Sequence, residues 1–491
     1  MRYFSTIALL IISQFVMGQP KSPFSKKPFE ISGKIDPYRP DSKNAYITFR
    51  VSDLSGRNKD TAIAINKDGS FGVTLYQVFS GDIAFLFNEE FVTMYASPGD
   101  KIYLSINPQQ FADEKTRPSS IEISGESSAI SKYIIRWNQA RANWEPSVIA
   151  DWSNKELSDE TFANDRKKQL AEELVFLEKF SAKESASTEF THWAKNSLLY
   201  SAGFDISFHC FAGKINDRLH DTTFMRMLED IPLKNDTALH NSDYYRYVNM
   251  VSGDLQIIAN INPAYATRKR NNGKNPVPIH FEMAEKYSSG LVKELFYYNM
   301  YFGIAPVFTD SYLTSFSGNV KDDILKAAFE LKRNKMIQPF QPVDIISKIQ
   351  QQKADTVTKG RILSVLEAET NRYVFIDFWG SWCAPCMLEM PHYPALIDSL
   401  KNLPVGFIFM STETKEEKVN EIKKLFAGKA RFINLTDNET RLLNNVFGFS
   451  SYPSHFLLGP GSRLLEMKVG SIASDSGVRK EVIQKLKESI K

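Results

Sequence analysis

The chain is poor in cysteine, with only three among its 491 residues. An exported protein that relied on crosslinks would carry several cysteine pairs spread among its elements, so a disulfide-built scaffold is excluded. Two of the three, Cys383 and Cys386, stand close together in the stretch FIDFWGSWCAPCMLEMPHYP, residues 375–394, and the third is Cys210. This arrangement predicts chemistry at the pair rather than structural crosslinking.

The chain also lacks a charge excess. Its 60 basic and 57 acidic residues leave a formal charge of +3, so nucleic acid and acidic polymers are not expected as partners. The one dense basic run, residues 267–274, has no interleaved aromatic residues and predicts a solvated loop. The seven histidines are dispersed and no second cysteine pair follows the first, so neither a metal nor another cofactor is expected.

Long apolar runs are absent, apart from a short one at the start. Arg2 precedes the apolar residues 7–12, and the small residues Val16 and Gly18 stand where a signal peptidase would cleave. The apolar stretch is shorter than the roughly 20 residues that span a membrane. This pattern predicts a signal peptide over residues 1–18 and a mature chain in the periplasm or cell envelope.

The length exceeds what one hydrophobic core usually serves, so two or three domains are expected. Residues 28–125 contain short β-branched and aromatic runs between turn signals, which predict a β-sandwich domain. The predicted strands are 45–51, 62–65, 70–76, 83–87, 91–96 and 101–106. Residues 126–348 show helical periodicity, as in 169–180, and predict a helical domain. The polar stretch 350–361 predicts a linker.

The last part, residues 350–491, alternates between strand and helix patterns. Residues 373–378 and 405–410 are continuous apolar runs, as in parallel strands buried on both faces. A helix is expected between them, from about Cys383 to Leu400, with a kink at Pro391. The whole chain is therefore predicted to be multidomain, with a β-sandwich, a central helical region and a C-terminal α/β domain.

A strand followed by Cys-x-x-Cys and a helix places the first cysteine at the helix N-terminus. Free backbone N–H groups and the helix dipole stabilise a thiolate there and lower its pKa. Cys383 is therefore the predicted nucleophile, and Cys386, on the same helix face, is expected to resolve the mixed disulfide. A half zinc site and an inert structural disulfide are disfavoured, because further ligands are missing and the strand–helix context suits a dithiol catalyst.

The motif VFIDFWGSWCAPC resembles the thioredoxin active site. Together with CMLEMP and the extra helix and strand between Met410 and Asn438, it resembles the TlpA/ResA-like family of exported thioredoxin-fold thiol-disulfide oxidoreductases. The similarity covers roughly residues 337–491, and the β-plus-helical part before it resembles the N-terminal extension of many such proteins. The resemblance implies a thioredoxin-like domain and a protein disulfide reductase that acts on a disulfide-containing client protein and takes electrons from a membrane thiol donor.

The resemblance also implies roles for four more residues. Asp377 takes the place of the buried acid of thioredoxins, where burial is expected to raise its pKa and allow proton exchange with Cys386; a purely structural role stays open. Trp382 is expected to cover the dithiol. Pro453 matches the cis-proline loop, which leaves the backbone of Tyr452 free to pair with a client chain as an added strand.

Several assignments stay open at this point. His455 either faces the redox site or packs as a strand histidine, and the packed role is favoured. Cys210, beside His209, is expected to behave as a small buried hydrophobe. The direction of electron flow is also open, with a disulfide oxidase or isomerase as the alternative. A third possibility is an envelope binding or assembly protein with an attached redox domain.

Overall fold

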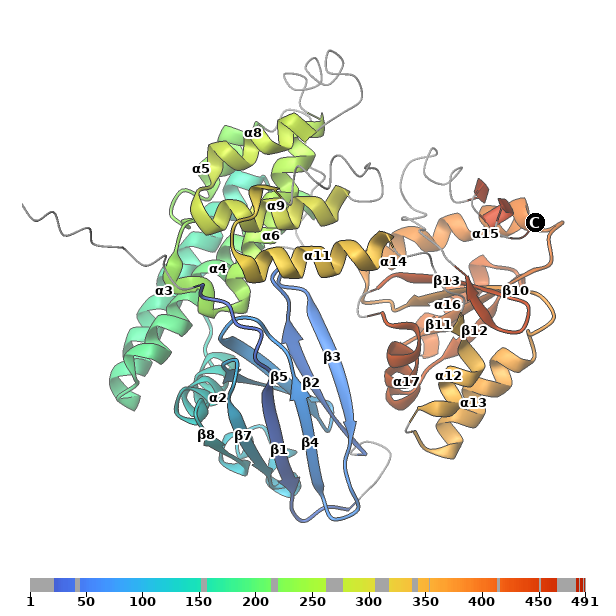
Figure 1. Ribbon diagram of the computed structural model, residues 1–491, viewed down its shortest axis with the longest axis horizontal. Helices are drawn as coiled ribbons and strands as arrows, with labels where there is room; N and C mark the ends of the chain where they lie inside the picture. The colour runs from blue at the N-terminus through green and yellow to red at the C-terminus, as the bar shows by residue number, and fades with distance from the viewer. Residues whose placement is uncertain are drawn as a thin grey trace, which may run out of the picture.

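The computed structural model describes most of the chain (Figure 1). The described residues are 22–39, 45–151, 157–212, 220–261, 277–304, 318–337, 343–352, 354–412, 416–449, 452–465, 483–484, 486–488 and 490. The predicted signal peptide and the basic run 267–274 lie outside them. None of the helices in these ranges combines the length and the apolar character that crossing a membrane requires.

Two four-stranded sheets form in the described part of residues 29–125, called here the two-sheet region. Their orders are β4-β1-β7-β8 and β3-β2-β5-β6. The strands are β1 (Phe29–Ile35), β2 (Tyr46–Ser52), β3 (Asn58–Ala64), β4 (Ser70–Leu75), β5 (Gly81–Phe87), β6 (Glu90–Ala96), β7 (Lys101–Ile106) and β8 (Ile121–Gly125). All six strands predicted individually are confirmed, and β1 and β8 are additional.

Alternation along the strands places one apolar core between these sheets. In β1, Phe29, Ile31 and Ile35 are buried while the residues between them are exposed or small. They belong to the same apolar cluster as Phe49 of β2 and Phe85 of β5, which come from the other sheet. The inner faces of both sheets therefore share a core, and their outer faces remain available to other parts of the chain.

Helices dominate the described residues from 128 to 337. They are α2 (Ser128–Ala142), α3 (Asp159–Glu184), α4 (Thr188–Ala212), α5 (Asp221–Met227), α6 (Ser242–Ile261), α8 (Val277–Tyr287), α9 (Gly290–Ile304) and α11 (Asp323–Ile337). The helix predicted at 169–180 is confirmed as part of α3.

Buried tyrosines build much of the core of this helical part. The hydroxyls of Tyr200, Tyr244 and Tyr247 each donate to a backbone carbonyl, so these large rings are buried with their polar ends satisfied. Cys210 is in the same core, and burial raises the pKa of its thiol well above the usual range. Its predicted role as a buried hydrophobe is confirmed, because a raised pKa and burial leave it unreactive.

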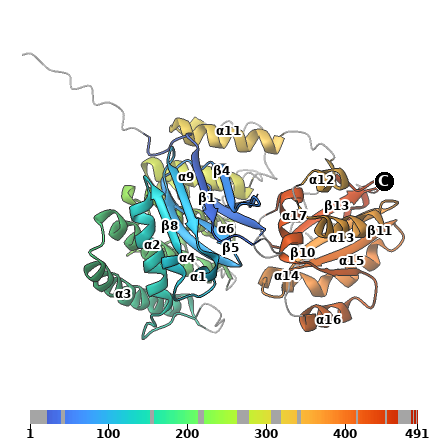
Figure 2. The ribbon, with the colours of Figure 1, turned by 90° about the horizontal axis from the view of Figure 1, so that it is seen from below.

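The described C-terminal residues form a six-stranded sheet of order β12-β11-β10-β13-β14-β9. The strands are β9 (Val343–Asp344), β10 (Tyr373–Trp379), β11 (Val405–Ser411), β12 (Arg431–Asn434), β13 (Ser454–Gly459) and β14 (Arg463–Leu465). The helices are α12 (Ile345–Gln351), α13 (Thr356–Glu367), α14 (Ala384–Glu389), α15 (Tyr393–Leu400), α16 (Glu416–Leu425) and α17 (Asp437–Phe447). Figure 2 shows these helices around the sheet.

The central strand β10 divides its side chains between two cores. Phe375 and Trp379 pack with residues of α14 to α16, whereas Ile376 and Phe378 pack with residues of α12, α13 and α17. Because side chains alternate along a strand, Asp377 points to the same face as Phe375 and Trp379. That face carries the helix that follows the cysteine motif.

The structure contradicts the predicted linker and confirms the predicted helix kink. The linker predicted at 350–361 is wrong: α12 reaches Gln351, and α13 begins at Thr356 with Asp355 as its N-cap. The polar residues of this stretch are the solvent face and cap of helices, which a composition signal cannot separate from a linker. The kink predicted at Pro391 is confirmed, because a 3₁₀ turn at Met390–His392 separates α14 from α15.

Candidate active site

The cysteine pair lies where β10 passes into α14. Cys383 is the N-cap of α14 and forms a disulfide with Cys386. The backbone N–H of Cys386 donates to Sγ of Cys383 over 3.2 Å. A donor at that sulfur favours the thiolate once the disulfide is reduced, because it stabilises the charged form. The predicted position of Cys383 at a helix N-terminus is therefore found in the structure.

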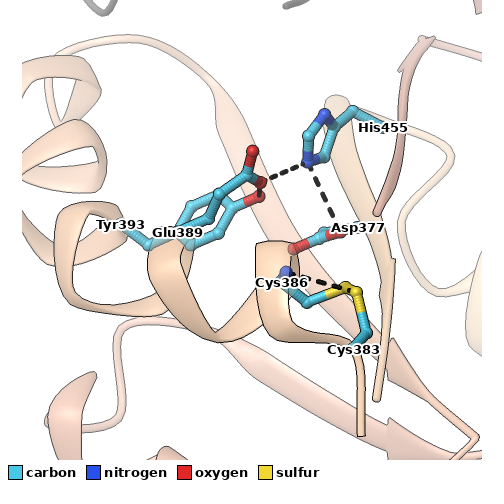
Figure 3. Close-up of a disulfide and its surroundings, with 6 residues drawn as sticks. All are labelled: Asp377, Cys383, Cys386, Glu389, Tyr393 and His455. Carbon is cyan, nitrogen blue, oxygen red and sulfur yellow. Dashed lines mark hydrogen bonds and ion pairs between the residues drawn. A yellow bond between two sulfur atoms is a disulfide. The ribbon is translucent and has the colours of Figure 1, made fainter. Parts of the chain in front are cut away.

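Asp377 is buried beneath this disulfide. Burial raises the pKa of its carboxyl to about 6, although His455 acts in the opposite direction. Figure 3 shows the carboxylate on the side of the disulfide that faces His455. A carboxyl with this pKa changes its protonation state near neutral pH, so it can take up or release a proton beside the dithiol.

A second carboxyl and an imidazole adjoin Asp377. The register of β10 and β13 places His455 opposite Asp377, with Nε2 of His455 3.6 Å from Oδ1 of Asp377. The same Nε2 lies 2.9 Å from Oε2 of Glu389, at the end of α14. All three side chains are almost fully buried. His455 therefore faces the redox site, which is the alternative that the sequence did not favour.

The two carboxylates determine the protonation of the histidine. Burial by itself lowers the pKa of His455, but Asp377 and Glu389 outweigh it, so this pKa lies above its ordinary value. Tyr393 adds a hydroxyl 3.5 Å from Oε2 of Glu389. Asp377 and Glu389 thus favour the protonated form of His455, and the three residues are called here the buried triad.

Glu389 was not identified from the sequence as a site residue. One signal was present, because Glu389 follows Cys386 by three residues and so lies on the same helix face. The ligand atoms of the buried triad lie within 4.8 Å of one another, a spacing that a metal ion could bridge. The hydrogen bond between Glu389 and His455 accounts for this closeness without an ion.

Aromatic residues border the outer side of the dithiol. Trp382, 61% exposed, packs edge-to-face against Tyr452, with 5.1 Å between the ring centroids. A Cβ at Gly380 would lie 2.6 Å from the indole of Trp382, so the glycine leaves room for this ring. The peptide bond between Tyr452 and Pro453 is cis, as the resemblance implied. The structure thus brings Trp382 and Tyr452 together next to Cys383.

These features define the class of the C-terminal region. Parallel β10 and β11, antiparallel β13, a dithiol at the start of α14 and a cis-proline before β13 are the parts that the resemblance implied. Residues 371–464 match the family described as thioredoxin-like. The C-terminal region is therefore a thioredoxin-like domain.

Named relatives match about a fifth to a quarter of the chain. ResA, a thiol-disulfide oxidoreductase of Bacillus cereus, is 28% identical over 97 residues, 20% of this chain and 54% of the relative. ResA of Geobacillus thermodenitrificans is 28% identical over 137 residues, 26% of this chain and 74% of the relative. The predicted resemblance to ResA is confirmed for this domain. The chain spans about half the length of the first of these relatives.

Solved structures with similarity to the chain include StoA and a thioredoxin domain. StoA of Bacillus subtilis is 19% identical, with a TM-score of 0.20, over 25% of this chain and 84% of StoA. The thioredoxin domain of a thiol-disulfide oxidoreductase from Bacteroides vulgatus is 15% identical, with a TM-score of 0.23, over 26% of this chain and 84% of that domain.

Proposed function

We propose that the protein is a thiol-disulfide oxidoreductase that reduces disulfides in client proteins. The observation that carries this proposal is the Cys383–Cys386 disulfide at the start of α14, above the buried carboxyl of Asp377. A dithiol in this position can accept and release two electrons, and a neighbouring acid can manage the proton that accompanies them.

The reaction begins with the reduced dithiol. The thiolate of Cys383 attacks one sulfur of the client disulfide, and the other client sulfur leaves as a thiolate that takes a proton from water. Cys386 then loses its proton and attacks Sγ of Cys383, which releases the second client thiolate. The client has gained two electrons, and the protein ends with the Cys383–Cys386 disulfide.

Asp377 is the proposed acceptor for the proton of Cys386. Its pKa of about 6 leaves the carboxylate ionised at neutral pH. Because this pKa lies close to neutral pH, the carboxyl can also give the proton back. His455 and Glu389 act through Asp377 and are positioning residues. The charge of His455 limits how far burial raises the pKa of Asp377, whereas the charge of Glu389 raises that pKa further.

The outer side of the site is the proposed place of client contact. Trp382 covers the dithiol, and the backbone of Tyr452, beside Pro453, pairs with an extended client segment. Backbone pairing accepts many sequences, which suits an enzyme that must reach different disulfides. The two-sheet region, which we infer to be a β-sandwich, and the helical part form an extension that accompanies this site.

The proposed location is the periplasm or cell envelope. It rests on the signal-like pattern of residues 1–18, which combines Arg2 with an apolar run. In an oxidising compartment a reductase needs a supply of electrons, so a membrane thiol donor is proposed to reduce the disulfide after each turnover.

An insulin reduction assay tests this function. Cys383→Ser is expected to abolish activity, while Cys210→Ser, at a buried cysteine, is the matched control and keeps it. Cys386→Ser is expected to accumulate a mixed disulfide at Cys383, which mass spectrometry identifies. Full activity of Cys383→Ser would refute the proposal.

A further inference from the structure

A groove of about 620 Å³ lies between the two-sheet region and the thioredoxin-like domain. One wall is the sheet β3-β2-β5-β6, and the other is α17 together with Gly448, Phe449 and Tyr452. Figure 1 shows β3 and α17 on facing sides of the two regions. Since the ring of Tyr452 packs against Trp382, the groove ends directly beside the dithiol.

The sheet wall is the outward face of its strands. The register pairs Arg50 with Asp60, and Thr48 with both Ala62 and Leu86. Because side chains alternate along each strand, these five residues line one face while the residues between them point into the core. In the described part of the chain no other sheet covers this face, and α17 stands opposite to it.

An ion pair and an aromatic ring lie on the sheet side of the groove. Arg50 binds both carboxylate oxygens of Asp60, at 2.7 and 2.8 Å, and its guanidinium lies 4.5 Å from the centre of the Phe91 ring. Charges of the two signs are equally represented around the groove, by Arg50, Lys59, Arg441, Asp60, Glu89 and Asp437. The groove is therefore suited neither to a strongly acidic nor to a strongly basic ligand.

Each wall carries a buried polar atom without a partner. Among the described residues, Oγ1 of Thr48 and Oδ1 of Asn444 have no hydrogen-bond partner, and Thr48 is only 6% exposed. Leaving a buried polar group unpaired is unfavourable, so a ligand that supplies a partner after a small rotation of the side chain is favoured. Thr48 can donate or accept and Asn444 Oδ1 accepts, which matches the N–H and C=O groups of a peptide backbone.

We propose that this groove binds an extended polypeptide segment of the client, next to the disulfide that is reduced. The proposal rests on the proposed function and names its substrate class, a polypeptide disulfide rather than a small one. The segment makes backbone hydrogen bonds to Thr48 and Asn444 and packs on Phe91. It leaves the groove at Tyr452, where its disulfide meets Cys383.

Variants that fill the groove from either wall test this inference in the full chain. Asn445→Trp fills it from the exposed side of α17, and Ala62→Trp fills it from the sheet. Asn420→Trp, at an exposed asparagine of α16 outside the groove, is the matched control. The measurement is the rate constant for oxidation of the reduced protein by insulin, divided by that for hydroxyethyl disulfide.

Both groove variants are expected to lower this ratio about ten-fold or more, while Asn420→Trp keeps the wild-type ratio. Wild-type ratios for both groove variants would refute client binding in the groove and leave the proposed redox function intact. Loss of both reactions in the wild-type protein would instead refute the proposed function.

A second measurement does not depend on redox activity. In the Cys383→Ser, Cys386→Ser double variant, a photo-crosslinking amino acid at position 445 is expected to capture the carboxymethylated insulin B chain. The same amino acid at position 420 is expected to capture none. Equal capture at the two positions, or no capture at 445, would overturn the inference.

Discussion

His455 and Asp377 face each other across strands β13 and β10, and the same imidazole nitrogen that approaches Asp377 binds Glu389. One histidine thus balances two buried acids directly beneath the dithiol. Burial drives the pKa of Asp377 upward, and the histidine limits that rise. The protonation of Asp377 therefore depends on a residue that does not touch the sulfurs.

Substituting Asp377 by asparagine is expected to remove a pH dependence. Above a pH of about 6 the carboxylate of Asp377 is ionised and can accept the proton of Cys386. Below this pH the carboxyl is already protonated and cannot accept it. The rate of mixed-disulfide release should fall as the pH drops through this value in the wild-type protein. In Asp377→Asn the release is expected to be about 10² times slower, without that inflection. Single-turnover kinetics between pH 5 and about 8 measure both.

The control for this substitution is Asp398→Asn, at an exposed aspartate of α15 whose ion pair with Lys429 contributes little. It should keep the wild-type profile. An inflection that persists in Asp377→Asn would assign the proton to another group.

Removing the histidine is expected to destabilise the oxidised protein. His455→Gln leaves Asp377 and Glu389 as two buried acids without a cation, which costs about 3–5 kcal/mol. Adding Glu389→Gln removes one of the acids and should recover part of this loss. His192→Gln, at an exposed position of α4, should change stability by less than about 0.5 kcal/mol. Urea unfolding of the four proteins gives the comparison, and a double variant no more stable than His455→Gln would argue against charge balance.

The stability of the wild-type protein should also depend on pH through the buried triad. Asp377 has a pKa of about 6 in the folded protein against an ordinary 3.8, so the folded state holds this proton more tightly. That contribution is complete below pH 3.8 and is lost as the pH rises through 6. The raised pKa of His455 acts in the same direction at higher pH, with loss above its ordinary value of 6.5.

The wild-type protein should therefore lose about 2 kcal/mol relative to Asp377→Asn between pH 4 and about 8. Urea unfolding of both oxidised proteins at the two pH values measures this difference. A constant difference would show that Asp377 titrates in the folded protein as it does in the unfolded chain.

Local motifs made much of the site predictable. Cys383 and Cys386 lie within one strand–helix unit, where spacing alone places their side chains, whereas the role of Asp377 was implied by the resemblance. Pro453 required the resemblance, because its position beside the dithiol depends on a strand far along the chain. His455 and Glu389 could not be paired in advance, since their contact depends on the register of β13 against β10.

The fold was predictable to a similar extent. The alternation of Phe29, Ile31 and Ile35 in β1 is a strand signal that the sequence itself carries. The groove was beyond prediction, because its walls come from separate regions and sequence patterns do not report which outer faces meet. The linker prediction at 350–361 failed for a similar reason. The polar residues of α12 and α13 dominate the composition of this stretch, although apolar residues of the same helices pack against the sheet.

The position of β9 and α12 predicts where the thioredoxin-like domain begins. We propose that it begins at residue 343, because β9 pairs with β14 and α12 buries Ile345 and Ile349 completely. Residues 343–491 are expected to fold alone, whereas residues 354–491 lose both isoleucines. Burial of each is worth about 1.5–3 kcal/mol, so the shorter fragment should be roughly 3–6 kcal/mol less stable in urea unfolding. Ile345→Ala with Ile349→Ala in the longer fragment should reproduce most of that loss, and equal stability of the two fragments would place the boundary after α12.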